Sequence, residues 1–159
     1  MKYFLKQTAV FKNNFDITDE NDQLVYTVKG NVGGLVGLRS SICSADGETE
    51  LITIKQRFSQ YKFDIKQNEY IVATVKKQWL SVKGKYIIEG LDWEMVGSSF
   101  IKHEYSIVNR NGDPIATLYK QGLTLNDKFA VDIIDSTENP ALIFAVILAL
   151  DAIIDQVSR

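Results

Sequence analysis

The chain has 159 residues, of which 45% are hydrophobic and 24% are charged, and its formal net charge is -2. This length supports one substantial core and is short for two domains, so we predict a single domain over residues 1–159. The small negative charge argues against a general nucleic-acid binder. The single cysteine, Cys43, excludes an internal disulfide framework and is typical of a reducing cytoplasm, where we expect the protein to reside.

The beginning of the chain does not have the pattern of an export signal, because Lys6 and Gln7 interrupt the apolar residues before a signal-peptide core forms. From about residue 2 to about residue 135, apolar and polar residues alternate, which places one face of each strand in a core. Clear examples are Phe15–Ile17, Tyr61–Ile65 and Tyr105–Ile107. Turn signals separate the segments, and together the pattern predicts twelve strands.

A repeat underlies these strands. A turn is followed by an apolar strand that carries a threonine and then a lysine, and the threonines of the four copies are Thr27, Thr53, Thr74 and Thr117. The last two copies are separated by about two repeat lengths, and the intervening segment Tyr86–Gly97 is predicted to be a degenerate hairpin. The repeating unit is therefore a hairpin of roughly twenty residues.

The segment from Lys55 to Lys85 is strongly basic, with eight basic residues against two acidic ones. Strand alternation places Lys62 and Lys66 on one outward face, with Lys76 near them on the returning strand. With Tyr70 and Trp79 near by, the segment is a candidate surface for anionic lipid headgroups or another polyanion. The residues predicted to form it are Lys62, Lys66, Lys76, Lys77, Lys83 and Lys85. The alternative is a solvated sheet exterior that carries charge for solubility.

The most informative element is the apolar run Ala141–Leu150, which continues past Asp151 into Ile154. Asn139 is a good N-cap and Pro140 suits the first helical position, so we predict a helix over about 139–156. The run is shorter than the ~20 residues of a membrane-spanning helix. A helix without a polar face must then be surrounded by protein.

Three architectures could bury such a helix: a closed barrel around it, a sandwich with a terminal helix, or an open sheet on one side. An open sheet would leave half of the helix in water, whereas closure buries every side and removes the edges of the sheet. We therefore predict a mainly β protein, a closed antiparallel barrel of roughly twelve strands wrapped around a buried C-terminal helix.

Asp151 and Asp155 lie one turn apart and would share a face near the far mouth of this barrel. They are the candidate residues for a metal site or for acid/base catalysis; the alternative is a pair of solvated or salt-bridged carboxylates. His103 is the only histidine and has no partner in the sequence, so we expect no metal and no cofactor.

The whole chain resembles the LURP-one-related family, whose fold is similar to the tubby C-terminal domain and to phospholipid scramblases. The resemblance is carried by the segments Met1–Gln7, Phe15–Asp22, Tyr86–Gly97 and Asn139–Asp151. It implies a twelve-stranded antiparallel barrel around a C-terminal hydrophobic helix. Tubby-like domains are associated with phosphoinositide binding, but none of their binding positions is matched here residue by residue.

Three functional hypotheses follow. The first is a non-enzymatic cytoplasmic module, soluble or peripheral to the membrane, that binds anionic phospholipid or a protein partner through the basic surface. The second is a small enzyme or metal-binding protein with a site near Asp151 and Asp155. The third is a structural scaffold for protein interactions. We expect no nucleic-acid partner and no membrane-spanning segment, and the oligomeric state stays open.

Overall fold

The computed structural model describes residues 1–8, 14–30, 39–57, 61–77, 86–99, 104–119 and 127–157. In this part of the chain twelve strands precede one helix. The elements are β1 (Lys2–Gln7), β2 (Phe15–Asp19), β3 (Leu24–Gly30), β4 (Arg39–Ser44), β5 (Glu50–Gln56), β6 (Lys62–Gln67), β7 (Tyr70–Lys77), β8 (Tyr86–Glu89), β9 (Trp93–Ser99), β10 (Glu104–Val108), β11 (Pro114–Tyr119), β12 (Asp127–Ile133) and α1 (Pro140–Val157).

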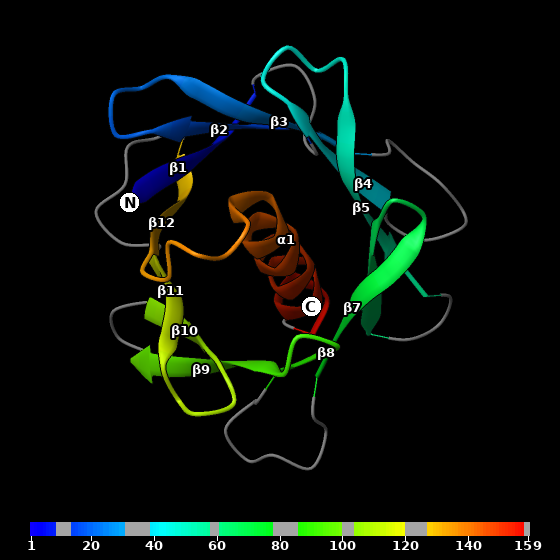
Figure 1. Ribbon diagram of the computed structural model, residues 1–159, viewed down its shortest axis with the longest axis vertical. Helices are drawn as coiled ribbons and strands as arrows, with labels where there is room; N and C mark the ends of the chain where they lie inside the picture. Colours follow the sequence, from blue (N-terminus) through cyan, green and yellow to red (C-terminus); the bar gives the residue numbers. More distant parts are fainter. Residues whose placement is uncertain are drawn as a thin grey trace.

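The twelve strands form a closed antiparallel barrel in which each strand pairs with its neighbours in the sequence (Figure 1). The first and last strands close the barrel, where Lys2 pairs with Asp132 and Leu5 pairs with Phe129. Closure removes the free edges that an open sheet exposes to other chains. The predicted fold class is therefore confirmed.

The repeat in the sequence corresponds to successive hairpins. Each of the four repeat threonines lies on the second strand of its hairpin, in β3, β5, β7 and β11, and the segment Tyr86–Gly97 covers β8 and most of β9. Three of the threonine hydroxyls donate hydrogen bonds to neighbouring groups: Thr27 to the Ala45 carbonyl, Thr53 to Glu50 and Thr74 to Asp64. The acceptors differ in kind and in distance along the chain, so the repeat conserves the hairpin and not one hydrogen bond.

Two of the hairpin turns share one hydrogen-bonding device. In the β2–β3 turn the carboxylate of Asp19 accepts the backbone N–H groups of Asn21 and Gln23, at 2.8 and 3.0 Å. In the β10–β11 turn the side-chain oxygen of Asn109 accepts the N–H groups two and four residues later, both at 2.9 Å. Short polar side chains that bond their own turn in this way explain why aspartate and asparagine predict the turns from sequence.

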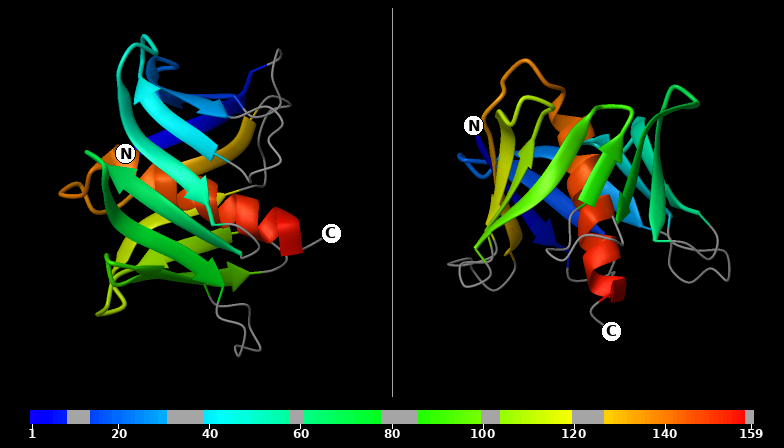
Figure 2. Two further views of the ribbon diagram at one scale, coloured as in Figure 1. Left: turned by 90° about the vertical axis from the view of Figure 1, so that its right-hand side faces the viewer. Right: turned by 90° about the horizontal axis from the view of Figure 1, so that it is seen from below.

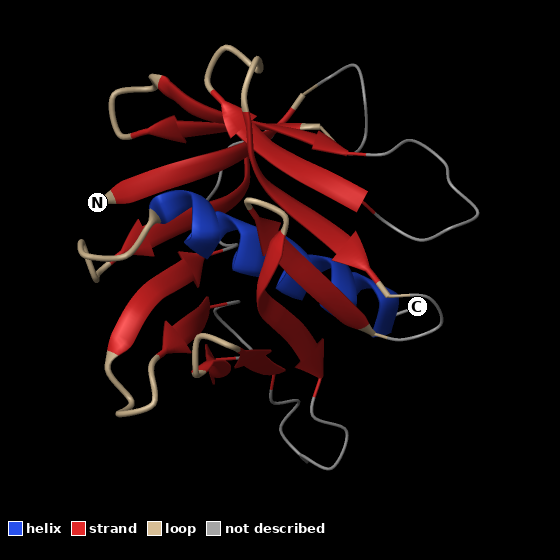
Figure 3. Cartoon of the chain, turned by 45° about the vertical axis from the view of Figure 1, so that its right-hand side comes forward, coloured by secondary structure: helices blue, strands red, loops and turns tan. Residues whose placement is uncertain are grey.

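Helix α1 begins where the sequence predicts. The side-chain oxygen of Asn139 accepts the N–H of Ala141 at 3.1 Å, which satisfies one of the donors left free at a helix N-terminus. Pro140 occupies the first helical position, where its missing N–H costs nothing. The helix runs through the barrel, with strands around it in each view (Figures 2 and 3).

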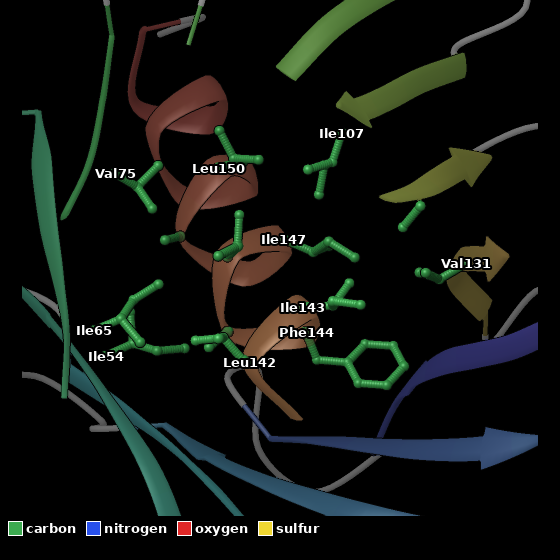
Figure 4. Close-up of a cluster of buried hydrophobic side chains, with 14 of the residues drawn as sticks. Ile54, Ile65, Val75, Ile107, Val131, Leu142, Ile143, Phe144, Ile147 and Leu150 are labelled. Atoms are coloured by element: carbon green, nitrogen blue, oxygen red, sulfur yellow. The ribbon is translucent and has the colours of Figure 1, made fainter. Parts of the chain in front are cut away.

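The helix packs against the barrel wall on all sides. Ile143, Ala145 and Val146 are completely buried. Figure 4 shows aliphatic side chains of the strands, such as Ile65 and Ile107, around the side chains of the helix. Near the start of the helix, the ring of Phe144 packs edge-on against Tyr3, with ring centroids 5.3 Å apart. Desolvation by this packing is the main reason that the pKa of Tyr3 is raised.

The helix occupies the interior in which many larger barrels hold a ligand. Neither this helix nor any other in the described residues is long and apolar enough to span a membrane. Binding or catalytic groups therefore have to be sought on the outer surface and at the two ends of the barrel.

Candidate functional site

The outer face of β5, β6 and β7 carries three of the six lysines that the sequence predicts for the basic surface. In β6 the side chains of Phe63 and Ile65 are buried in the core, so strand alternation turns Lys62 and Lys66 outward. The antiparallel register places Lys76 of β7 directly opposite Lys62. These three lysines therefore occupy one continuous surface.

Strand β5 extends this surface. Lys55 alternates with the buried Ile54 and is exposed, and it pairs across the sheet with Asp64. Arg57 follows the strand and reaches the same aspartate. We call the outward basic residues of these strands the cationic face: Lys55, Arg57, Lys62, Lys66 and Lys76.

Asp64 holds one of these cations in place. Its carboxylate accepts a hydrogen bond from the guanidinium of Arg57 at 2.9 Å and from the hydroxyl of Thr74 at 2.8 Å. Burial tends to raise the pKa of Asp64, but these two hydrogen bonds and the positive charges of Arg57 and Lys66 outweigh it and leave the pKa below its ordinary value. Asp64 is therefore a stable anion that neutralises Arg57.

A second acid lies at the border of the cationic face. Lys76 forms an ion pair with Glu89 of β8. Lys76 also faces Lys62 across the β6–β7 pair, where like charges repel. The pair with Glu89 offsets this repulsion and ties Lys76 toward β8.

The remaining cations of the face are Lys55, Lys62 and Lys66, and within the described residues none of them forms an ion pair. Lys55 and Lys66 are exposed, and Lys62 is half-buried. Their ammonium groups are thus free to meet an external anion, whereas Arg57 and Lys76 already have protein partners.

The other predicted residues of the basic surface differ in position. Lys77 pairs with Tyr86, which is buried in the core, so it belongs to the opposite face of β7 from Lys76. Strand alternation alone explains this difference, because adjacent residues point to opposite sides of a sheet. Lys83 and Lys85 lie outside the described residues, as does Trp79.

Apolar side chains border the cationic face at the β6–β7 turn, and the sequence pattern does not reveal them. Tyr70 is 76% exposed and Ile71 is 52% exposed, while Leu51 of the neighbouring β5 is 36% exposed. A register shift in the β6–β7 pair brings Ile71 opposite Lys66. The one available signal was the aromatic Tyr70, already noted beside the basic segment.

The acidic pair of the helix is only partly described. Asp151 lies in the last turns of α1 and is half-buried, and the side chain of Asp155 is outside the description. Among the described residues, no group of three or more histidine, cysteine or acidic side chains is arranged to hold a metal ion. Cys43 is buried, and burial raises the pKa of its thiol, which keeps the thiol protonated and unreactive.

One shallow hollow of about 330 Å³ lies on the outside of the barrel at the β8–β9 turn. Its charged lining is already paired within the protein. Glu89 binds Lys76, and Asp92 accepts a hydrogen bond from Arg110 at 2.8 Å. The hollow therefore offers an external ligand fewer free charges than the cationic face does.

Comparisons with known proteins agree with this architecture. The chain is 25% identical over 158 residues to the uncharacterized protein YxjI of Bacillus subtilis, an alignment that covers 97% of this chain and 94% of that protein. The X-ray structure of a protein from Arabidopsis thaliana superposes with a TM-score of 0.62 at 20% identity, over 99% of this chain and 91% of the plant chain, which supports a tubby-like fold. The sequence profile of the LURP-one-related family matches residues 1–151. The chain therefore belongs to the LURP-one-related family.

Proposed function

We propose that this protein is a non-enzymatic binding module of the cytoplasm that attaches reversibly to anionic phospholipid surfaces through the cationic face. One observation carries the proposal. Lys55, Lys62 and Lys66 share the outer face of β5 and β6 and form no ion pair among the described residues, and the nearby Asp64 already binds Arg57. Cations that the fold leaves unpaired on one face can form ion pairs with headgroup phosphates and carboxylates.

The magnitude of this attraction fits reversible attachment. A lysine held near an anionic leaflet contributes ~1 kcal/mol, so three such lysines contribute roughly 3 kcal/mol. The interaction decays over a Debye length of ~8 Å at physiological salt. Binding by charge alone is therefore weak, depends on the fraction of anionic lipid and weakens as salt is added.

The position of the cationic face also supports a binding role over a catalytic one. The face is a convex sheet exterior, and the barrel interior behind it is filled by α1. Catalysis requires a concave site that excludes water and converging reactive groups. Ion pairing with a flat, charged surface requires neither.

Vesicle flotation tests the proposal. The protein is mixed with vesicles of phosphatidylcholine alone or with added phosphatidylserine, at low and at physiological salt. We expect flotation only with phosphatidylserine, with less protein bound as salt rises. The double variant Lys62→Glu/Lys66→Glu should lose this binding.

The matched control is Lys2→Glu/Lys29→Glu, which makes the same change in net charge at lysines of β1 and β3. This control should bind as the parent protein does. If the parent fails to float with phosphatidylserine at low salt, or if both double variants lose equal binding, the cationic face is not a lipid site. A role for Asp151 and Asp155 would then be tested first, by turnover and metal-binding assays of their asparagine variants.

A further inference from the structure

We infer that the protein docks on an anionic bilayer with the β6–β7 turn closest to the membrane and with apolar side chains entering the headgroup layer. We call this orientation tip-first docking. This inference rests on the proposed function and adds to it an orientation and a second, apolar contact. The inserting residues are the exposed apolar side chains at the end of these strands, which we call the apolar tip: Leu51, Tyr70 and Ile71.

The backbone at the turn projects the tip away from the barrel. Asn68 and Glu69 connect β6 to β7 with positive φ angles of 52° and 69°, the conformation of the two-residue turn that matches the twist of a hairpin. Tyr70 follows at once and is paired with Gln67. Its side chain is 76% exposed, so most of its ring is in contact with water.

A β-bulge sets the direction of Ile71. The register shifts between Ile65 and Lys66, so that Ile65 pairs with Ala73 but Lys66 pairs with Ile71. Without the shift, Lys66 would pair with Val72. Because paired residues share a face, the bulge brings Ile71 to the outward side beside Lys66 and leaves it 52% exposed.

The neighbouring strand adds Leu51 to the same surface. Leu51 is two residues before Thr53, and Thr53 pairs with Lys66, so both β5 residues face outward. Ile71 and Leu51 thus share the outward face with the exposed Lys66, and Tyr70 lies beside them at the turn, on the opposite face of the hairpin. Tyrosine is enriched where membranes meet water, and lysine stems extend along apolar surroundings toward phosphate.

A bilayer suits the size and charge of this surface better than a protein partner does. Together with the five residues of the cationic face, the three of the apolar tip make eight residues, fewer than the 20 to 30, roughly, that each partner contributes to a stable protein interface. A bilayer accepts a small apolar insertion when unpaired basic residues stand beside it. Lys66 meets that condition at the tip itself, because it is exposed, pairs across the strands with Ile71 and forms no ion pair among the described residues.

Tip-first docking predicts that the lysines of the cationic face contribute unequally to membrane binding. Lys62 and Lys76 lie four or more residues farther from the turn than Lys66, or about 13 Å at ~3.3 Å per residue. This distance exceeds the ~8 Å Debye length at physiological salt. Lys66 should therefore contribute more to binding than Lys62, whereas a protein lying flat on the cationic face would use both equally.

Glu69 provides a second test of the docking orientation. It is exposed at the turn and would face the anionic surface in tip-first docking. Its charge should oppose binding there. Glu69→Gln removes the charge and should strengthen binding to phosphatidylserine vesicles severalfold at low salt, and it should have little effect if the protein lies flat.

The decisive substitution is Ile71→Ser, measured by flotation with phosphatidylcholine/phosphatidylserine vesicles. We expect affinity to fall by about tenfold. In the parent protein roughly half of the isoleucine side chain moves from water into the membrane on binding, and serine removes this favourable transfer. The matched control is Ile134→Ser. Ile134 is 50% exposed and follows β12, which stands six strands from β6 in the closed order, so its loss should leave binding unchanged.

Insertion is measured directly with Tyr70→Trp and a lipid brominated in its acyl chains. We expect vesicle binding to quench the fluorescence added by this tryptophan, relative to the parent protein. Val96→Trp is the control, because Val96 is exposed on β9, away from the tip, and a tryptophan there should not be quenched.

The outcomes separate the two proposals. If the parent protein binds in a salt-dependent way and loses binding in Lys62→Glu/Lys66→Glu, but Ile71→Ser matches Ile134→Ser and Tyr70→Trp is not quenched, the proposed function holds and tip-first insertion is wrong. If the parent does not bind anionic vesicles at all, both fail. Quenching at position 70 together with selective loss in Ile71→Ser supports the inference.

Discussion

The two faces of β6 and β7 show how one pair of strands serves two purposes. On the inner face, Phe63, Ile65 and Val75 are almost completely buried and pack in the core that contains α1. On the outer face, Lys62 and Lys66 alternate with these same residues and form no ion pair among the described residues. The inner face therefore determines stability, and the outer face is free to determine binding.

The largest effect on stability is expected from a substitution in the buried core of the barrel. Ala145 is completely buried in the middle of α1, so Ala145→Asp places an unpaired carboxylate in the core. Such a charge costs more than ~4 kcal/mol, a large part of the ~5 to 15 kcal/mol that stabilises a typical domain. We expect loss of the folded state, measured by circular dichroism and by resistance to proteolysis.

The control for this substitution is Ala45→Asp. Ala45 is half-exposed just beyond β4, so an aspartate there can stay in water and the protein should remain folded. A folded and protease-resistant Ala145→Asp protein would show that α1 is not enclosed by the barrel.

An intermediate effect on stability is expected from substitution of Asp64, whose carboxylate joins two neighbouring side chains on the outer surface. Asp64 is only 14% exposed and bonds both Arg57 and Thr74. Asp64→Asn should lower the free energy of unfolding by ~1 to 2 kcal/mol at neutral pH, measured by urea denaturation.

The loss should depend on pH with a defined sign. The pKa of Asp64 is lower in the folded protein than its ordinary value of 3.8. Its stabilising contribution is therefore complete above that value and disappears as the pH falls through the lower folded-state pKa. The difference in free energy of unfolding between the parent and Asp64→Asn should shrink in acid.

The control is Asp22→Asn, which removes a 77% exposed partner of Lys6 and should cost less than ~0.5 kcal/mol of stability. Equal losses of stability in both variants would contradict the bridging role of Asp64.

The smallest effect on stability is expected at Lys62. It faces Lys76 across the sheet, so Lys62→Gln removes a like-charge contact while keeping most of the stem. The free energy of unfolding should stay within ~0.5 kcal/mol of the parent or rise slightly. A clear loss of stability, measured by urea denaturation, would mean that Lys62 has a structural role. It would contradict the conclusion that the inner face determines stability while the outer face is free for binding.

Much of the fold could be predicted from the sequence because its signals are local. Asn139 and Pro140 mark the helix start, and the turns at Asp19 and Asn109 use side chains that bond the adjacent backbone. The alternation around Phe63 and Ile65 is also local, so the shared outward face of Lys62 and Lys66 followed from it. The difference between Lys76 and Lys77 follows from the same rule.

Other features of the candidate site depend on neighbours that no local pattern specifies. The partner of Lys76 is Glu89, which comes from the next hairpin and is placed by the register of β7 and β8. The pair of Arg57 with Asp64 depends in the same way on β5 and β6. These contacts decide which cations are neutralised and which are left free.

The sequence by itself determined that the strands must close around α1, because Ala141–Leu150 has no polar side and every side must leave water. It also determined the order of the hairpins and the strand faces that alternation assigns. Only the tertiary structure decided the free charges of the cationic face and the outward position of Ile71. The physical reason is that ion pairs and a β-bulge are properties of paired strands, whose register is set by packing over the whole barrel.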